Sequence, residues 1–345
     1  MEQFHLALFH ISTDKEMFKE VRHMNKSMQV TAFDGQLKPV EVDLPPPGAD
    51  EVRIDVLACS VNFGDTLIVL GKYQEKPELP FAPGMEIVGI VTALGTDVNA
   101  LKLNQKIVAY IGFGGMSQSL NVKAELCIPI ADDADPVTYA ALPIAYGTSH
   151  LALFHRAKIQ QNETLVVLGA SGGVGLTAVE LGVLAGANVI ACARGADKLK
   201  VAKSKGAHHL IDTEKTDIKE AVKALGGADI VYDPVGGDQF HSVLRACKPE
   251  ARVLPLGFAS GDIPQIPANL LLVKNINVLG FYWGGYRVFA PEIMNESLSQ
   301  IIDWAEAGQI KPHVSNVLAL DQANEALALL SNRKATGKVI VDMTL

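Results

Sequence analysis

Residues 164–175 read TLVVLGASGGVG, an apolar run that passes directly into a glycine-rich turn. The run predicts a short strand buried on both faces, and the apolar spacing from Val174 to Ala185 predicts a helix. Glycines at such a turn let the backbone approach a pyrophosphate, which the free N–H groups of the helix N-terminus bind. A tight turn without a ligand is the alternative. The context favours a dinucleotide site with contacts at Gly169, Ser171, Gly172, Gly173, Val174 and Gly175.

Strands and helices go on alternating after this turn. We expect strands at residues 188–193, 209–211, 229–233, 252–256 and 277–281, and a helix at 198–205. Such alternation predicts a doubly wound parallel sheet, the Rossmann arrangement of an α/β domain.

The two flanking blocks have a different pattern. Before the glycine turn, expected strands at 52–58, 87–94 and 106–111 are separated by Gly and Pro turns, which predicts a β-rich, barrel-like domain. The last block, from Tyr286, predicts helices at 291–306 and 321–330 and strands at 314–319 and 338–342. We expect the final strand to return to the first domain.

Length and composition exclude several classes of protein. The 345 residues suggest two domains. Lys and Arg number 30 against 38 Asp and Glu, so no cationic surplus exists to make nucleic acid the main ligand. Four scattered cysteines fit reduced thiols in an intracellular protein, and no apolar run approaches the roughly 20 residues of a membrane span. We expect a cytoplasmic protein.

Residues 1–27 form an amphipathic leading segment. A mitochondrial presequence is poor in acidic residues, yet Glu2, Asp14, Glu16 and Glu20 occur here. The segment is interpreted as an N-terminal extension or as the product of a start codon upstream of Met28. Mitochondrial targeting stays as an alternative.

The end of the second predicted strand bears on the choice of dinucleotide. An NAD site places an Asp or Glu there, about 20 residues past the glycines, to bind the ribose hydroxyls. This chain has Ala193, Arg194 and Gly195 at that point, with Lys198 following. Arg194 and Lys198 can reach a 2′-phosphate, although both could also be solvated surface charges. The missing acid favours NADP(H).

A set of motifs in consistent order supports a family assignment. They are NFGD at 62–65, PGMEIVG at 83–89, the glycine turn, DPVGG at 233–237, and the segments 257–261 and 333–338. With these motifs the chain resembles a zinc-free medium-chain dehydrogenase/reductase of the quinone oxidoreductase type, related to zeta-crystallin. The resemblance implies an N-terminal extension (1–27), a GroES-like catalytic domain (28–145, completed by 287–345), a Rossmann NADP-binding domain (146–286), and a homodimer.

The resemblance also bears on metal chemistry. Zinc-dependent relatives have a Cys where this chain has Asn62 and a His where it has Met85, and neither Asn nor Met is a good zinc ligand. We therefore expect no metal. Without a Lewis acid, reduction of an electrophilic π-system is favoured over alcohol oxidation. The expected reaction is hydride transfer from NADPH to a quinone or an α,β-unsaturated carbonyl compound.

Three residues are candidates for a catalytic role. The amide of Asn62 could bond a substrate oxygen, or it could cap a helix starting near Phe63. Asp65 could brace the backbone or the nicotinamide ribose, or be a simple charge at a helix N-terminus. Tyr73 could donate a hydrogen bond or a proton to the reacting carbonyl, as enoyl-thioester reductases of this superfamily suggest, or be a packed loop residue.

The remaining cofactor contacts follow from the resemblance and from the position of strand ends. They are Thr148, placed at the start of a helix, then Val235, Gly236, Phe258, Ser260, Phe281, Trp283 and Arg333. Trp283 and Tyr286 could line the substrate pocket or belong to a dimer interface.

Two further functions stay open beside quinone or enone reduction. One is an enoyl-thioester (2-enoyl-CoA) reductase that uses Tyr73 as its proton donor. The other is a non-catalytic, NADPH-binding or RNA-binding protein of the crystallin kind.

Overall fold

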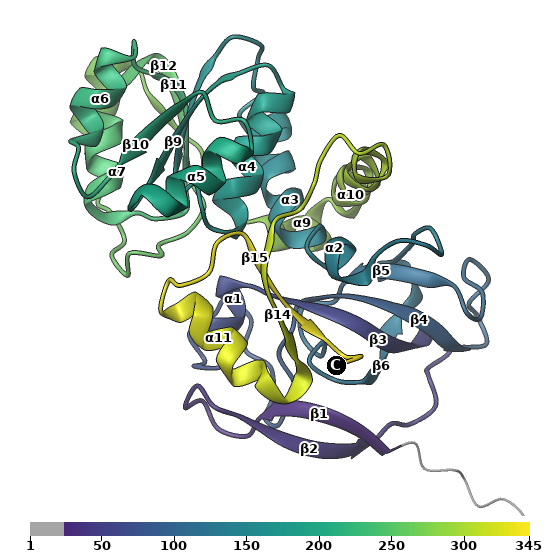
Figure 1. The fold of residues 1–345 in the computed structure, drawn as a ribbon. Helices are drawn as coiled ribbons and strands as arrows, with labels where there is room; N and C mark the ends of the chain where they lie inside the picture. Colours follow the sequence, from purple (N-terminus) through teal and green to yellow (C-terminus); the bar gives the residue numbers. More distant parts are fainter. Residues whose placement is uncertain (1–23) are drawn as a thin grey trace, which may run out of the picture.

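Two β-sheets organise the part of the chain that the computed structural model describes, residues 24–345 (Figure 1). One sheet is parallel and lies in the middle of the sequence. The other is mostly antiparallel and combines strands from both ends of the chain. This arrangement agrees with the expected GroES-like and Rossmann architecture.

The parallel sheet has the order β10-β9-β8-β11-β12-β13. Its strands are β8 (Thr164–Leu168), β9 (Asn188–Ala193), β10 (His209–Asp212), β11 (Ala228–Asp233), β12 (Cys247–Pro255) and β13 (Asn277–Val278). Alternate residues of β8 enter different cores, with Leu165 in one apolar cluster and Val166 in another. The strand is therefore buried on both faces, as its apolar run predicted.

Strand β13 is shorter than its apolar run predicted. The ladder ends at Val278, where the expectation extended to Phe281. The partner strand β12 ends at Pro255, which has no N–H to continue the ladder.

Helices cover both faces of the parallel sheet. They are α4 (Gly173–Leu184), α5 (Ala196–Ser204), α6 (Ile218–Ala224), α7 (Gly237–Leu244) and α8 (Ala268–Lys274). Among residues 24–345, no helix has the length and apolarity that crossing a bilayer requires.

The second sheet has the order β14-β15-β3-β4-β5-β7, with β6 paired to β3. Its strands are β3 (Glu51–Val61), β4 (Glu86–Leu94), β5 (Lys106–Tyr110), β6 (Ser119–Lys123), β7 (Cys127–Pro129), β14 (Val314–Ala319) and β15 (Lys338–Asp342). Strand β15 pairs antiparallel with β3, with Val339 opposite Val61. The expected return of the last strand to the first block is confirmed.

The N-terminal hairpin moves one expected boundary. Strand β1 (Met24–Val30) pairs with β2 (Leu37–Asp43), and so includes residues 24–27, which we had assigned to the extension. Asn25 is buried and donates to the Ser119 carbonyl at 2.7 Å, and the Ser27 hydroxyl bonds that of Ser117 at 2.8 Å. Residues 24–27 are thus part of the folded domain. The rest of that prediction lies outside the described residues.

The remaining helices connect the two sheets and cover the second one. They are α1 (Phe63–Ile68), α2 (Pro136–Ala140), α3 (Pro143–His150), the π-helix η2 (Leu151–Arg156), α9 (Tyr286–Phe289), α10 (Pro291–Glu306) and α11 (Ala323–Ser331), with 3-10 turns η1 (Ala124–Leu126), η3 (Trp283–Gly285) and η4 (Leu320–Gln322). Helix α3 lies at the junction of the two sheets. Since it begins at Pro143, Thr148 lies in its last turn, and the expected helix start at Thr148 was wrong.

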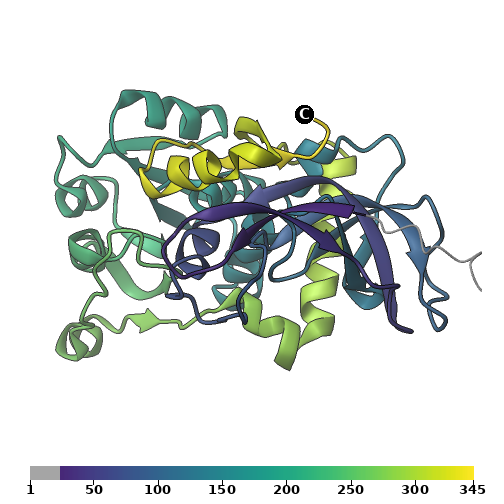
Figure 2. The same ribbon diagram turned by 90° about the horizontal axis from the view of Figure 1, so that it is seen from below.

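Segments from near the two ends of the described chain lie side by side next to the second sheet. Figure 2 shows the β1–β2 hairpin beside helix α11. The Asn324 amide exchanges two hydrogen bonds of 2.9 Å with the backbone of Leu37. These bonds attach the hairpin to the C-terminal segment.

Candidate active site

Asn62, Glu86 and Lys338 form a buried group at the edge of the second sheet, here called the Lys338 triad. Each stands at an end of one of three neighbouring strands, β3, β4 and β15. The Lys338 ammonium donates to the Asn62 amide oxygen at 2.6 Å and to Glu86 Oε1 at 2.9 Å. The Asn62 amide nitrogen donates to the same Glu86 oxygen at 2.8 Å. Lys338 is 4% exposed and Glu86 0%, so the ion pair is shielded from water.

Glu86 also holds the junction helix. Its second carboxylate oxygen accepts the backbone N–H of Ile144 at 2.7 Å. This N–H lies in the first turn of α3, where helical N–H groups have no partner within the helix. One carboxylate therefore joins α3 to the start of β15 and the start of α1.

These contacts show what surrounds Asn62 at the start of α1. Asn62 occupies the N-cap position of α1, and its amide oxygen accepts a hydrogen bond from the Lys338 ammonium at 2.6 Å. The carboxylate of Asp65 serves the local backbone instead, accepting the N–H of Asn62 at 2.8 Å and that of Gly84 at 2.9 Å. Burial raises the pKa of Asp65 to about 6, against the lowering effect of these two hydrogen bonds.

The positions that hold zinc in metal-dependent relatives contain other chemistry. Met85 is buried, and its methyl carbon lies 3.0 Å from where a Cβ on Gly64 would stand. Asn62 is bonded to an ammonium ion. Among residues 24–345, no group of three or more His, Cys, Asp or Glu side chains is arranged to hold a metal ion.

Three tyrosines gather next to the triad. Tyr73 lies against Gly64 and shares a hydrogen bond with Tyr282. The hydroxyls of Tyr282 and Tyr110 both lie within 3.1 Å of the Cβ position of Gly284. Burial raises the pKa of Tyr73, Tyr110 and Tyr282 above the usual value. The three phenols are therefore neutral hydrogen-bond donors at physiological pH.

A charged pair lies beside these phenols. Glu75 Oε1 accepts a hydrogen bond from the Tyr282 hydroxyl at 3.4 Å and lies 3.7 Å from the Arg287 guanidinium. That guanidinium stands over the ring of Tyr110 at 5.4 Å. None of these four residues was predicted from the sequence, although the expected contacts at Phe281 and Trp283 indicated the region.

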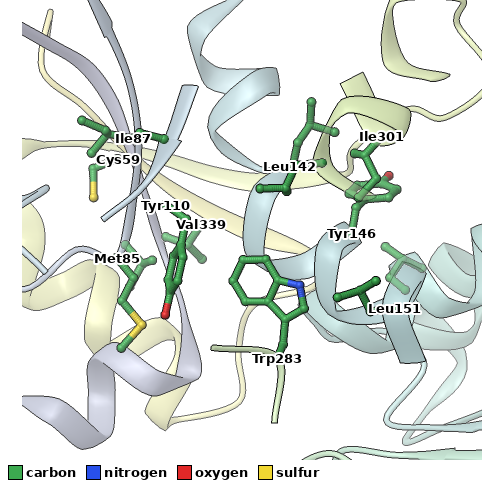
Figure 3. Close-up of a cluster of buried hydrophobic side chains, with 14 of the residues drawn as sticks. Cys59, Met85, Ile87, Tyr110, Leu142, Tyr146, Leu151, Trp283, Ile301 and Val339 are labelled. Carbon is green, nitrogen blue, oxygen red and sulfur yellow. The ribbon is translucent and has the colours of Figure 1, made fainter. Parts of the chain in front are cut away.

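Trp283 fills the space between the two domains (Figure 3). Its ring meets that of Tyr110 edge-on at 4.7 Å and lies against Gly147 of α3. The indole N–H is buried and has no acceptor among the described residues. Tyr286 is buried against the rings of Phe281 and Phe289 at 5.8 and 4.6 Å, so it belongs to the core of its own chain.

The glycine turn has the geometry that its sequence predicted. Gly169 has φ +59°, a left-handed conformation that favours glycine. A Cβ on Gly175 would come within 2.2 Å of the Gly169 carbonyl oxygen. Gly172 is the N-cap of α4, which places Gly173 and Val174 in the first helical turn. The Ser171 carbonyl accepts the Gly337 N–H at 2.8 Å, so the turn is attached to the residue preceding Lys338.

Three cations converge at the end of β9. The Lys198 ammonium donates to the Arg333 carbonyl at 2.9 Å, and the Arg333 guanidinium donates to the Ala259 carbonyl at 2.8 Å. Burial, followed by the charges of Arg194 and Arg333, lowers the pKa of Lys198. Arg194, Lys198 and Arg333 are here called the cation cluster. The first two are close in sequence, and Arg333 comes from a distant part of the chain.

The turns after β11 and β12 lie together beside the glycine turn. The Val235 side chain comes within 2.9 Å of the Cβ position of Gly169. The Ser260 N–H donates to the Val235 carbonyl at 2.9 Å, and Phe258 packs against Gly236. Thus the expected contacts in these turns adjoin the glycine turn, whereas Thr148 and Phe281 lie toward the Trp283 end.

Comparisons with known proteins agree with this geometry. The family model described as "Alcohol dehydrogenase GroES-like domain" matches residues 48–132, and the one described as "Zinc-binding dehydrogenase" matches residues 173–304. Quinone oxidoreductase-like protein 2 of Bos taurus is 38% identical over 307 residues, 88% of each chain. Its homologue from Nematostella vectensis is 39% identical over 301 residues, 86% of this chain and 82% of that protein.

A solved structure shows the same architecture. The crystal structure of Escherichia coli quinone oxidoreductase complexed with NADPH is similar to this chain with a TM-score of 0.85 at 25% identity. The match covers 92% of this chain and 99% of that one. Both domains and their connection are therefore shared with that enzyme.

Proposed function

Because this chain belongs to the zinc-free quinone oxidoreductase family of medium-chain dehydrogenases/reductases, we propose that it reduces quinones or α,β-unsaturated carbonyl compounds with NADPH. It is a zinc-independent oxidoreductase, and its coenzyme is NADP(H). Our proposal concerns the class of compound that accepts the hydride.

The residues at the nucleotide end fit this coenzyme. The Gly169–Gly175 contact leaves no room for a side chain and brings the backbone close to the N-terminus of α4, where a pyrophosphate binds. We propose that Gly169, Ser171, Gly172, Gly173, Val174 and Gly175 hold it. Arg194, Lys198 and Arg333 would bind the 2′-phosphate. Strand β9 itself ends at Ala193 and is followed by Arg194, where an NAD(H) site places an Asp or Glu for the ribose hydroxyls, so the cations suit NADP(H).

The other proposed contacts surround the rest of the coenzyme. Val235, Gly236, Phe258 and Ser260 lie in turns beyond the carboxyl ends of parallel strands, where ligands bind in open α/β sheets. Thr148, Phe281 and Trp283 are proposed for the nicotinamide end. The unpartnered indole N–H of Trp283 supports a ligand there, since a buried donor without an acceptor costs about 1–3 kcal/mol.

The Lys338 triad is the observation that carries the proposed acceptor class. It places a buried ammonium ion against Asn62, a position that relatives use for zinc, and so leaves no Lewis acid to polarise an alcohol. Quinones and enones accept hydride at an already electrophilic centre. When bound, NADPH supplies that hydride, and one further proton completes the hydroquinone or the saturated carbonyl compound, leaving NADP+.

The chain's own residues would position the acceptor and supply the proton. We propose that Asn62 directs its remaining amide N–H to the acceptor oxygen and that Asp65 fixes the backbone at Asn62. Tyr73 stays protonated because burial raises its pKa. It can therefore donate a hydrogen bond to the acceptor oxygen. It can pass its proton once reduction has made that oxygen basic, although the raised pKa makes it a weaker acid than a free phenol.

The test is oxidation of NADPH and NADH with a panel of acceptors in the presence of a chelator. The panel holds 9,10-phenanthrenequinone, 1,4-benzoquinone, an alkenal and crotonyl-CoA. We expect NADPH-dependent turnover of a quinone or the alkenal. Turnover of crotonyl-CoA alone would replace the proposal with an enoyl-thioester reductase. Silence with NADPH still bound would favour a non-catalytic role.

We further propose a homodimer formed along the outer edge of the parallel sheet. Strand β13 is the last in the sheet order, and helix α8 beside it has no buried residue. Leu272 and Val273 of this helix are 77% and 69% exposed. A second copy that covered this apolar surface would extend the sheet. Sedimentation velocity should show a dimer for the native chain and a monomer for Leu272→Asp.

A further inference from the structure

We infer that Lys338 is a positioning residue that acts through Asn62, polarising its amide so that a cation buried in the protein assists reduction without touching the acceptor. This inference rests on the proposed function, because it requires Asn62 to bind the acceptor oxygen. It assigns a role to a lysine that the sequence analysis placed at the end of the 333–338 motif without giving it a function.

The geometry of the amide gives the first argument. Lys338 donates to the Asn62 oxygen at 2.6 Å, a short charge-assisted bond. One amide N–H is used by Glu86 at 2.8 Å. The other reaches the Ser60 carbonyl at 3.5 Å, a distance at the limit of hydrogen bonding. This second N–H is weakly engaged and is the one an acceptor oxygen can take.

Polarisation gives the second argument. A hydrogen bond to an amide oxygen draws electron density from the nitrogen and strengthens its N–H groups as donors. The effect is larger inside a protein, where the dielectric is low, and Lys338 is 4% exposed. The cation thereby stabilises negative charge that develops on an acceptor oxygen, which is the task of an oxyanion-stabilising donor.

The location of the lysine stem gives the third argument. The Cδ atom of Lys338 lies 3.4 Å from the Cβ position of Gly173, and Gly337 donates to the Ser171 carbonyl. The same residue thus contacts the turn proposed for the coenzyme and the amide proposed for the acceptor. A lysine needed solely to balance Glu86 would not require this contact with the glycine turn.

The experiment removes the charge of Lys338 without leaving Glu86 unpaired. Wild type, Lys338→Met with Glu86→Gln, Asn62→Ala, and the triple variant are compared for kcat and KM with 1,4-benzoquinone and an alkenal, and for NADPH affinity by fluorescence. We expect the double variant to bind NADPH within 3-fold of wild type. Its kcat should fall about 10- to 100-fold with the alkenal and less with the more electrophilic quinone. When Lys338→Met and Glu86→Gln are added to Asn62→Ala, they should not lower kcat further.

Three outcomes would overturn the inference. An unchanged kcat in the double variant would mean that Lys338 serves only to neutralise the charge of Glu86. Equal losses with both acceptors, or losses that multiply with those of Asn62→Ala, would show that Lys338 does not act through the amide. Absence of turnover in wild type, with NADPH bound, would remove the proposed function itself and this role with it.

A second variant guards against failure to fold. Lys338→Gln with Glu86→Gln keeps a neutral hydrogen-bonding side chain at the site. It should fold, as judged by near-UV circular dichroism, and show the same larger loss with the alkenal. Retention of wild-type kcat by this variant would contradict the need for a positive charge.

Discussion

The cation cluster exposes its positive charges to water, whereas the Lys338 triad buries its positive charge. Arg194 and Arg333 lie at the surface and share their neighbourhood with Lys198, so like charges stand together in water that screens them. Lys338 is buried with Glu86 and is compensated at 2.9 Å. Exposed cations that lie close together can bind an anion from solution, whereas a buried charge needs a partner within the protein. The first group therefore suits the ligand role that we propose for it, and the second is an internal ion pair of the protein.

The largest expected effect tests this difference through stability. Lys338→Met leaves Glu86 buried without its cation, which should lower the free energy of unfolding by about 3–5 kcal/mol. Arg194→Ala, at the exposed cluster, should change it by less than about 0.5 kcal/mol. Urea unfolding followed by circular dichroism measures both.

Glu86→Gln added to Lys338→Met is the control for that comparison. The neutral pair should recover most of the lost stability, because no unpaired charge remains buried. If Lys338→Met and Arg194→Ala cost the same, the buried and exposed charges do not differ as described.

The next effect concerns Asp65, which adds a second buried carboxyl beside the triad. Its pKa is about 6 in the folded chain against a usual 3.8, so the folded state binds the proton more tightly. The unfolding free energy of wild type should therefore fall relative to Asp65→Asn as the pH rises from about 4 to 6, by up to about 3 kcal/mol, and stay level above pH 7. Urea unfolding across this pH range measures the difference, and a flat difference would contradict it.

A smaller effect concerns coenzyme binding at the cation cluster. Arg194→Ala should raise the Kd of NADPH about 10- to 100-fold, because a charge-assisted bond to the 2′-phosphate is lost. The Kd of NADH, which lacks that phosphate, should change less than 2-fold. Titration by fluorescence energy transfer from the two tryptophans measures both constants. Unchanged NADPH affinity, with NADH binding equally well, would remove the assignment of NADP(H).

How far the sequence predicted these two regions follows from how each is assembled. The glycine turn is contiguous, and its strand, turn and helix are dictated by adjacent residues. Arg194 and Lys198 follow within one turn of the next strand, so they were also predictable. Arg333, far along the chain, came from the resemblance alone.

The Lys338 triad shows why the other part of the site could not be predicted from the sequence. Residues 62, 86 and 338 become neighbours because β3 lies between β4 and β15, an order that no local pattern specifies. Two signals were present: Glu86 interrupts an apolar run, and Lys338 opens an apolar strand. Either charge could have been a solvated strand end, and it takes the sheet order to show that they neutralise each other.

The smallest expected effect concerns the neutral donors beside the triad. Tyr73→Phe removes a hydroxyl that shares a hydrogen bond with Tyr282 but leaves the ring against Gly64. Since water can protonate a reduced quinone, kcat with 1,4-benzoquinone should fall less than about 3-fold, a change below 1 kcal/mol. Tyr282→Phe is the matched control, because it breaks the same bond from the other side. A loss above 100-fold that is specific to Tyr73→Phe would mean that proton transfer from this phenol, and not from water, limits turnover.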